Sequence, residues 1–432
     1  MKVFRSKFND QGAEMEFQYK SDVLNTLQRR GFIYQVTHPE SLDAAFYSSS
    51  VVSYCGFDAT AKSLHVGNLL ALMVARWMQY YGHTPILLMG GGTSKIGDPS
   101  WRDTSRPLLK DKEIEENIYG IQRNVRQLLK FDGPQAARCV NNGDWLDQLL
   151  YIPFLRDIGI HFSVNRMLGL EHVASRLEKE EPLSFIEFNY LLLQSYDFLK
   201  LYQEYGCTVQ FGGSDQWGNI VSGVDLVRRY AKAQVFGLTL PLTTLRDGKK
   251  MGKTAQGAIW MDASLYTPYA YWQFWRNVED EDVMRFLKLY TLISLEDIQY
   301  LQSEKGINEA KILLADEATS LIHGRQCLEG IHAMVQGVFH AQAPEILDHN
   351  MPHWIIPPQR FTQGLTMVEI LEHLNFVTSR SEARRKIFQG AVKMDQKVWE
   401  DSSQILTTSD MPRNWAFIRC GKKHQGWIKL DT

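Results

Sequence analysis

Short β-rich runs alternate with long segments of helical apolar periodicity between residues 51 and 244, and this alternation restricts the fold more than any other feature. It is typical of parallel strands joined by crossover helices. The sequence therefore predicts an α/β fold with a doubly wound, Rossmann-like parallel sheet. The expected strands are 51–58, 84–91, 138–142, 207–212 and 237–243, and the expected helices are 112–131, 163–179, 185–205 and 214–233.

The length of the chain and the changes of pattern along it predict several domains. At 432 residues the chain is too long for one ordinary hydrophobic core. Residues 1–245 form the expected sheet domain, with a helical insertion at about 110–182. Helical periodicity replaces the strands beyond residue 261, which predicts a loop and a helical domain over 246–343. Prolines at 344, 352, 357 and 358 predict a linker over 344–360, and a small α+β domain is expected at 361–432.

Charge and cysteine content narrow the possible partners and the compartment. The net charge is −2, so bulk electrostatics do not indicate a nucleic-acid partner. Residues 361–432 nevertheless carry 11 Lys and Arg against 8 Asp and Glu, a local surplus of +3. Five cysteines without a C-x-x-C pair argue against a zinc site and a disulfide framework. We expect a cytoplasmic protein with no membrane partner, or a mitochondrial matrix protein if the source is a eukaryote.

Two separated motifs predict a nucleotide site. Residues 54–58 (Tyr-Cys-Gly-Phe-Asp) lead into 65–68 (His-Val-Gly-Asn), where a strand is expected to turn into a helix whose first N–H groups face a phosphate. Far downstream, 250–254 (Lys-Met-Gly-Lys-Thr) places cations on a loop that contains glycine. A phosphate-binding P-loop is excluded as an alternative reading of the second motif. Its pattern G-x-x-x-x-G-K-T would require glycine at position 247, where this sequence has Asp247. A histidine at a helix start, taken alone, is more often a capping or core residue.

These two motifs resemble the two sequence blocks of class I aminoacyl-tRNA synthetases, in the form of the bacterial-type tyrosyl enzymes, and the resemblance covers nearly the whole chain. It implies a tyrosine–tRNA ligase. Such an enzyme converts L-tyrosine and ATP to tyrosyl adenylate and pyrophosphate, and then transfers tyrosine to the terminal adenosine of tRNA(Tyr). ATP is then a substrate, Mg²⁺ accompanies it, and no dedicated protein metal site is expected. The family also implies a homodimer, and residues 154–159 resemble its interface sequence.

The resemblance also assigns residues to the reaction and to ATP. Asn68 departs from the usual histidine of the first block, but its amide can still donate a hydrogen bond. The residues expected to act in catalysis are Thr60, His65, Asn68, Lys250, Lys253, Thr254, Arg102 and Arg106. The residues expected to bind ATP are Cys55, Gly56, Asp58, His65, Gly67, Gly213, Asp215 and Lys253.

The tyrosine pocket is expected to draw on four segments of the chain. Tyr190, Gln194 and Asp197 recur at i, i+4 and i+7, on one face of a helix. Taken alone, that spacing also fits a wet or partner-paired helix face. The resemblance implies that Tyr190 and Gln194 hold the α-ammonium group of the substrate, while Asp197 and Tyr54 hold its phenolic hydroxyl. The residues expected to bind tyrosine are Tyr54, Thr93, Asp98, Tyr190, Gln194, Asp197, Gln210 and Gln216.

The basic segment 379–387 is expected to form a helix in a small RNA-binding fold that resembles a domain of a ribosomal small-subunit protein. The residues expected to bind tRNA are Arg380, Arg384, Arg385, Lys386, Lys422 and Lys423. Most short basic clusters are solvated faces, and only the position of this one after the catalytic blocks favours RNA. Two other functions stay open, a different adenylyl-transferring enzyme and an RNA-binding paralogue without catalysis.

Overall fold

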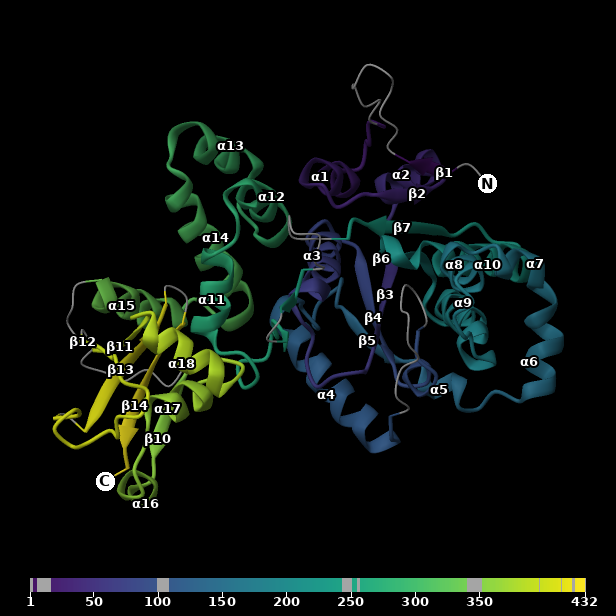
Figure 1. Ribbon diagram of the computed structural model, residues 1–432. Coiled ribbons are helices and arrows are strands. Elements are labelled where there is room, and N and C mark those ends of the chain that lie inside the picture. The colour runs from purple at the N-terminus through teal and green to yellow at the C-terminus, as the bar shows by residue number, and fades with distance from the viewer. Residues whose placement is uncertain are drawn as a thin grey trace. The chain divides into compact units, whose positions relative to one another are not determined.

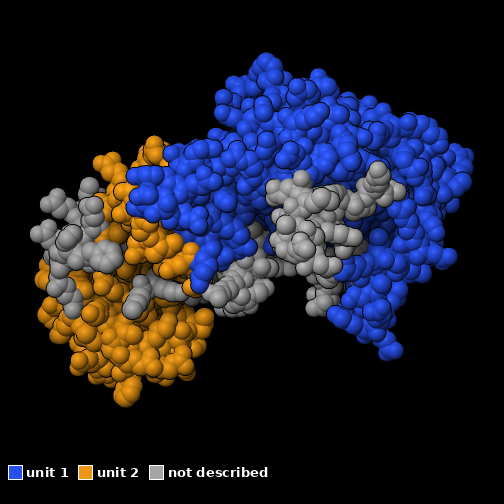
Figure 2. Space-filling model, turned by 90° about the horizontal axis from the view of Figure 1, so that it is seen from above, with its two compact units in different colours: residues 1–253, 281–304 blue, residues 254–280, 305–432 orange. Residues whose placement is uncertain are grey.

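The computed structural model describes residues 3–5, 17–98, 109–242, 251–254, 257–339, 352–395, 397–412, 414–421 and 424–431. The chain forms two compact units, coloured separately in Figure 2. Unit 1 consists of Met1–Lys253 and Glu281–Glu304, and unit 2 consists of Thr254–Asp280 and Lys305–Thr432. The chain thus leaves unit 1, enters unit 2 and returns before it ends in unit 2.

Unit 1 is built on a seven-stranded sheet with the order β1-β2-β7-β6-β3-β4-β5. The five strands from β7 to β5 are parallel, as the sequence predicts, whereas β2 pairs antiparallel with β7 and β1 pairs antiparallel with β2. The strands are β1 (Val3–Arg5), β2 (Gln35–Thr37), β3 (Val52–Asp58), β4 (Thr84–Gly90), β5 (Arg138–Asn141), β6 (Cys207–Gly213) and β7 (Phe236–Leu240). Because β3 continues to β4 on one side and adjoins β6 on the other, the strand order reverses between β3 and β6.

Helices cover both faces of this sheet, with α3 and α4 on one face and α9 and α10 on the other (Figure 1). The predicted helix over 163–179 is wrong, because the chain bends at Gly169 and forms two short helices. The helices of the sheet region are α1 (Asp22–Arg30), α2 (Pro39–Ser48), α3 (Val66–Tyr80), α4 (Asp111–Leu128), α5 (Gly143–Leu146), α6 (Tyr151–Asp157), α7 (Val164–Leu168), α8 (Glu171–Glu178), α9 (Phe185–Tyr205) and α10 (Trp217–Ala231). Three 3₁₀ turns join them, η1 (Thr93–Lys95), η2 (Gly159–His161) and η3 (Ser214–Gln216).

Local sequence fixes both ends of α9, the helix that carries three of the expected tyrosine-binding residues. The Ser184 hydroxyl accepts from the Glu187 N–H at 3.2 Å, while the Glu187 carboxylate accepts from the Ser184 N–H at 3.0 Å. This reciprocal capping satisfies two N–H groups that would otherwise lack partners. The helix ends at Gly206, whose φ of 64° suits the left-handed cap. These signals explain why the predicted bounds of 185–205 are confirmed.

The first helix is joined to the segment that returns to unit 1. Arg30 of α1 is buried, and it donates to the carbonyl oxygens of Lys288 (3.0 Å), Thr291 (3.3 Å) and Ile293 (2.6 Å) at the end of α12 (Asp280–Tyr290). Its guanidinium also lies 4.3 Å from the ring centre of Trp77. The next helix, α13 (Leu295–Glu304), belongs to the same unit. A cation therefore caps the carboxyl end of α12, where the helix dipole favours positive charge.

Unit 2 begins with helices and ends in a small α+β domain. Its second sheet has the order β10-β14-β13-β11-β12, with β10 parallel to β14 and the other pairs antiparallel. The helices are α11 (Pro268–Arg276), α14 (Ile307–His323), α15 (Cys327–Phe339), α16 (Pro358–Thr362), α17 (Met367–His373) and α18 (Arg380–Phe388). The strands are β10 (His353–Ile356), β11 (Val392–Met394), β12 (Lys397–Val398), β13 (Trp415–Cys420) and β14 (His424–Leu430), and a separate two-stranded sheet pairs β8 (Lys253–Thr254) with β9 (Gly257–Ala258).

The expected fold class is confirmed, with additions that the sequence pattern did not indicate. The antiparallel strands β1 and β2 were not expected, and neither was β13. Four residues in the range expected to be a linker form β10, which pairs with β14 through residues of high β propensity. Within the part of the chain that the structure describes, no helix combines the length and apolar character needed to cross a membrane.

Candidate active site

The expected site residues gather where β3 and β6 end. In open α/β sheets, ligands bind outside the carboxyl ends of the strands at the point where the strand order reverses. Tyr54, Cys55, Gly56 and Asp58 lie along β3, whereas Gln210 and Gly213 lie on the neighbouring β6. Asp215 and Gln216 follow in η3, at the same edge of the sheet. The sheet therefore brings together residues that are about 150 positions apart in the sequence.

A buried phenol and a buried carboxylate form the floor of this region. Tyr54 is 1% exposed, and its hydroxyl has no hydrogen-bond partner among the described residues. Asp197 of α9 is 2% exposed and accepts from the Asn142 side-chain amide at 2.9 Å and from the Trp145 indole N–H at 2.8 Å. Burial raises the pKa of Asp197 to about 7, although these two donors oppose the rise. Burial, followed by the charge of Asp197, raises the pKa of Tyr54 well above its usual value.

A second polar cluster centres on Asp58. Its carboxylate accepts from the Thr93 hydroxyl at 2.9 Å and from the Tyr190 hydroxyl at 3.3 Å. The amide of Asn142 donates to the Thr93 oxygen at 3.1 Å and also reaches Asp197. Asn142 thus joins the two clusters into one hydrogen-bonded network. Asp58 was assigned to ATP by resemblance, and the partners of its carboxylate include two residues assigned to tyrosine.

A third chain of amides closes the region from the side of α10. Asn219 donates to the side-chain oxygens of Gln194 at 3.0 Å and Gln216 at 3.1 Å. Gln216 in turn donates to the Asp98 carboxylate at 2.8 Å. The side-chain oxygen of Gln210 is buried and has no partner among the described residues. The three clusters together with the unpaired Tyr54 hydroxyl and Gln210 oxygen contain the expected tyrosine-binding residues from four separate segments.

The sequence analysis missed Asn142, Trp145 and Asn219. Asn142 was the last residue of the predicted strand 138–142 and immediately follows β5, at the same edge of the sheet as Asp58, so a polar residue at the end of a predicted strand was an available signal. Asn219 lies on α10, three residues after Gln216. Trp145 gave no comparable signal, because a tryptophan in a short helix more often belongs to a core.

The first sequence block forms the start of α3. His65 is the N-cap residue, and its Nδ1 accepts from the Gly67 N–H at 3.0 Å. The side-chain oxygen of Asn68 accepts from the His65 N–H at 3.1 Å, which completes a reciprocal cap. Asn68 therefore stabilises the start of α3, because its side-chain oxygen accepts from the His65 N–H. Thr60 lies on the preceding loop, and its side chain is exposed.

The backbone of the second block approaches the first. A Cβ atom on Gly67 would lie 2.9 Å from the carbonyl oxygen of Met251, and one on Gly252 would lie 2.8 Å from the Gly67 nitrogen. Gly252 has a φ of 90°, which also favours glycine. The blocks thus meet through two glycines. Lys250, Arg102, Arg106, Lys422 and Lys423 lie outside the described residues, as do the side chains of Lys253 and Thr254.

The basic helix predicted in the last domain is confirmed as α18. Arg380 pairs with Glu372 at 3.0 Å, and Lys386 pairs with Glu382 at 3.0 Å. Arg384 and Arg385 are exposed and form no ion pair with any residue in the described ranges. Of the four basic residues of this helix that are expected to bind RNA, two therefore form ion pairs with carboxylates and two, Arg384 and Arg385, do not within the described ranges.

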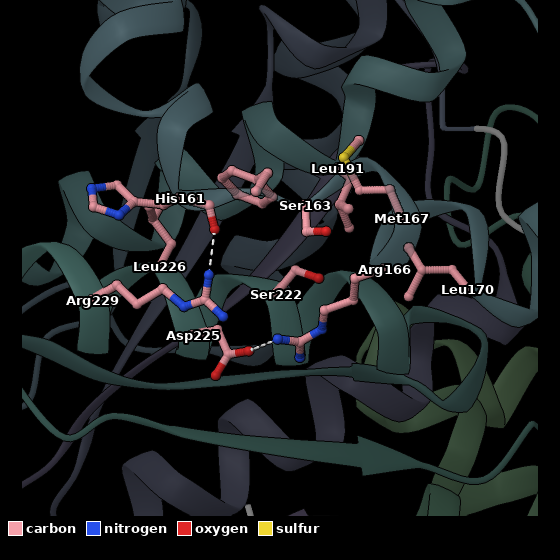
Figure 3. A pocket seen from close by; sticks show the side chains of 11 residues that line it. His161, Ser163, Arg166, Met167, Leu170, Leu191, Ser222, Asp225, Leu226 and Arg229 are labelled. Atoms are coloured by element: carbon pink, nitrogen blue, oxygen red, sulfur yellow. Dashed lines mark hydrogen bonds and ion pairs between the residues drawn. The ribbon is translucent and has the colours of Figure 1, made fainter.

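A pocket open to solvent lies beside the network and is lined by none of the expected site residues. Figure 3 shows that two arginines cross it from opposite walls: Arg229 donates to the His161 carbonyl oxygen at 2.7 Å, and Arg166 pairs with Asp225. Leu191, which follows Tyr190 on α9, forms part of its apolar wall. Because both arginines are engaged by protein atoms, the pocket does not present a free cationic site.

Comparisons with known proteins show the family to which the chain is similar. The family described as tRNA synthetases class I (W and Y) matches residues 48–340, and the S4 domain matches residues 368–411. The chain is 47% identical over 423 residues to a tyrosine–tRNA ligase of Cereibacter sphaeroides, covering 96% of this chain and 100% of that one. It is 45% identical over 418 residues to one of Paracoccus denitrificans, with 96% and 100% covered. A C-terminally truncated mitochondrial tyrosyl-tRNA synthetase of Aspergillus nidulans superimposes with a TM-score of 0.67 at 29% identity, covering 74% of this chain and 94% of that one.

Proposed function

The chain belongs to the class I tRNA synthetases, and within them to the tyrosine–tRNA ligases, and from this premise we propose that it activates L-tyrosine with ATP and transfers it to tRNA(Tyr) at the edge of β3 and β6. The observation that carries the proposal is the buried Tyr54 hydroxyl, which lacks a described partner and whose pKa is raised by burial and then by the charge of Asp197. A phenolic substrate would supply the missing hydrogen-bond partner. Phenylalanine would leave the Tyr54 hydroxyl unpaired, whereas Asp197 would keep its bonds from Asn142 and Trp145.

This pair gives the pocket a physical basis for its selectivity. A site that hydrogen-bonds a substrate hydroxyl rejects the analogue without it, because buried polar groups are then left unsatisfied. The tyrosyl enzyme is itself a standard example of that principle. Asn142 and Trp145 hold Asp197 by its two oxygens, so the carboxylate is oriented before a substrate arrives. We assign Tyr190, Gln194 and Gln210 to the α-ammonium and the adjacent pocket wall.

Tyrosine activation requires positioning and charge stabilisation more than a strong base. The tyrosine carboxylate attacks the α-phosphorus of ATP, a new oxygen–phosphorus bond forms, and the bond to the bridging oxygen breaks as pyrophosphate leaves. Because His65 Nδ1 accepts from Gly67, the proton of the neutral ring lies on Nε2, and we assign that N–H to a phosphate of ATP. We assign Lys250 and Lys253 to the departing pyrophosphate, with Arg102 and Arg106 nearby.

The second step transfers tyrosine to RNA. A ribose hydroxyl of the terminal adenosine attacks the carbonyl carbon of tyrosyl adenylate, and AMP leaves. Mg²⁺ is proposed to enter with ATP, bound by its phosphates. In the described part of the chain, no group of three or more His, Cys, Asp or Glu side chains is placed to hold a metal ion.

We also propose that two copies of the chain associate through an apolar face of unit 1. Large apolar side chains are exposed along α6 to α9, a region at one end of this unit (Figure 1). They include Tyr151, Ile152, Ile160, Val164 and Phe185, and Ile160 is 76% exposed. An apolar patch of this kind marks an interaction surface. Ile160→Glu should convert the dimer to a monomer in sedimentation velocity; a wild-type monomer at working concentration would contradict the proposal.

The S4 domain is proposed to contact tRNA through α18. Arg384 and Arg385 lie one turn from Phe388, which is 90% exposed at the end of the same helix. An exposed aromatic ring beside free guanidinium groups suits an unpaired base and its phosphates. Arg384→Ala should lower the salt dependence of tRNA binding, whereas Phe388→Ala should weaken binding and leave that dependence unchanged. An unchanged affinity in both variants would remove α18 from the interface.

Tyrosine-dependent exchange of pyrophosphate into ATP is the test of the function itself. It should be run beside phenylalanine and tryptophan with the full-length protein. Exchange with tyrosine alone would support adenylation and pocket selectivity together. A folded protein that binds tRNA but exchanges with none of the three would favour the RNA-binding paralogue, and exchange with another acid would favour a different adenylyl-transferring enzyme.

A further inference from the structure

Helix α4 supports the loop that carries the first sequence block. The loop, residues 59–64, joins β3 to α3 and ends immediately before His65. From α4, the Asn124 side-chain oxygen accepts from the Leu64 N–H at 2.8 Å and from the Ser63 hydroxyl at 2.9 Å. Asn117 donates to the Ala59 carbonyl oxygen at 2.8 Å. Both ends of the loop are thus bonded to a single helix.

The middle of the loop rests on a glycine of the same helix. A Cβ atom on Gly120 would lie 1.9 Å from the Lys62 carbonyl oxygen, so no other residue fits there without moving the loop. At the rim, Lys62 pairs with Glu116 at 3.0 Å. Opposite α4, the Ala59 N–H donates to the Ser94 hydroxyl at 2.7 Å. The position of the loop is therefore defined from both sides.

The spacing shows that this surface is distinct from the face that packs α4 into the core. Asn117, Gly120 and Asn124 recur at i, i+3 and i+7, which places them in one stripe. Both asparagines are buried, at 2% and 1% exposure. The apolar positions of α4 form a neighbouring stripe, namely Ile114, Ile121, Val125 and Leu128. A helix that only packed against the sheet would not need buried amides directed at a loop backbone, because burial of polar groups costs free energy unless they are paired.

We propose that Asn117, Gly120 and Asn124 are positioning residues for the ATP half of the reaction. They act through the loop backbone and thereby fix Thr60 and His65 relative to the phosphates. The proposal rests on the proposed function. It predicts a separation of the two substrates, because the side chains that bond to the carboxylates of the tyrosine network, those of Asn142, Thr93 and Gln216, lie outside residues 59–64. The loop bonds to this network only through the backbone among the described contacts, from the Thr60 N–H to the Asp58 carbonyl oxygen at 2.9 Å.

Asn124→Ala is the primary test. It removes an acceptor that serves two donors, and we expect kcat/KM for ATP in pyrophosphate exchange to fall roughly tenfold to a hundredfold, as a displaced catalytic loop would produce. The dissociation constant for tyrosine, measured without ATP, should stay within about twofold of wild type. Asn124→Asp keeps the acceptor and should restore most of the ATP parameter, because only the side-chain oxygen of Asn124 is used in the described contacts.

Two further variants separate positioning from stability. Val125→Ala removes a fully buried side chain from the adjacent apolar stripe and should lower the melting temperature without the selective loss toward ATP. In Gly120→Ala the higher helix propensity of alanine favours α4, but the added Cβ clashes with the Lys62 carbonyl oxygen. This variant should therefore impair the ATP step without a matching loss of helix stability. Equal losses for ATP and tyrosine, or the same profile in Val125→Ala, would overturn the inference. Absence of exchange in the wild type would instead refute the proposed function.

Discussion

Trp145 donates its indole N–H to Asp197 over 2.8 Å, so the carboxylate that is proposed to recognise the substrate hydroxyl is itself held by a buried aromatic side chain. Asn142 holds the other oxygen at 2.9 Å. Two donors favour the charged form, but burial opposes it more strongly and raises the pKa of Asp197 to about 7. Asp197 is therefore held in a fixed orientation, but its burial lowers the free energy of unfolding of the protein when the carboxylate is charged near neutral pH.

The first prediction concerns the pH dependence of stability. The pKa of Asp197 is raised in the folded state, so its contribution is fully present below the unfolded pKa and is lost as the pH rises toward 7. Wild-type stability should fall by roughly 1.4 kcal/mol per pH unit within that window from this group alone. Asp197→Asn should lack this slope in chemical unfolding at pH 5 and pH 8. Asp157→Asn, at an exposed carboxylate, should follow the wild type; identical slopes in all three proteins would contradict the prediction.

The second prediction is that Tyr54→Phe acts in opposite directions on stability and selectivity. Removing a buried hydroxyl without a partner relieves a desolvation cost and should stabilise the protein by about 1 kcal/mol. The preference for tyrosine over phenylalanine in pyrophosphate exchange should fall by about tenfold, the value of one hydrogen bond. Tyr81→Phe is a matched control, since its hydroxyl bonds to Thr26 at 2.8 Å and its loss should destabilise the protein without changing selectivity. Destabilisation by Tyr54→Phe would show that the hydroxyl is satisfied.

The third prediction concerns the residue that joins the two polar clusters. Asn142→Ala leaves Asp197 with one donor and deprives the Gly92 N–H of the acceptor it has at 2.8 Å. The free energy of unfolding should fall by about 3 kcal/mol, and tyrosine binding should weaken with it. Asn141→Ala removes loop bonds to the Gly91 and Gly143 N–H groups only, so it should retain tyrosine affinity. Equal tyrosine affinities in the two variants would mean that Asn142 is a loop residue and not a pocket residue.

The fourth prediction tests the contact between the two sequence blocks. Gly252→Ala introduces a Cβ 2.8 Å from the Gly67 nitrogen, in addition to the strain of a positive φ. The exchange rate should fall roughly tenfold or more while tyrosine binding without ATP is unchanged. Gly257→Ala isolates the strain, because Gly257 has a φ of 119° but no atom within 4 Å of the added Cβ. If both variants lose the same activity, strain and not the contact with Gly67 is responsible.

The sequence predicted the parallel part of the sheet because short β-rich runs alternate with long segments of helical periodicity. It predicted α9 to the residue because Ser184 and Gly206 carry explicit start and stop signals. It missed β1, β2 and β10, which are short strands of three or four residues whose pairing is set by tertiary context. The break between α7 and α8 was missed because a single glycine within a periodic segment is an ambiguous signal.

Prediction of the site was uneven for a similar reason. Tyr54 and Asp197 were named from family resemblance, since no spacing rule relates a strand residue to a helix residue 143 positions later (197 − 54). The contacts of Asn142 with Asp197 and of Asn219 with Gln194 join distant segments and leave no local pattern in the sequence, although the position of Asn142 at the end of a predicted strand was a usable signal. The capping role of Asn68, by contrast, lies within three residues of His65, so it is the kind of interaction that local sequence can reveal.

The hydrogen bonds of Arg30 can form only late in the synthesis of the chain. Its guanidinium reaches carbonyl groups 258 to 263 residues further along, so the first helix cannot complete its contacts until α12 has been synthesised. Until then a buried cation over Trp77 lacks its acceptors, and such a group is costly to bury. Contacts of such long sequence separation also form slowly. A fragment that ends at residue 253 would contain every strand of the sheet and still be an unfinished domain, prone to local opening at its amino terminus.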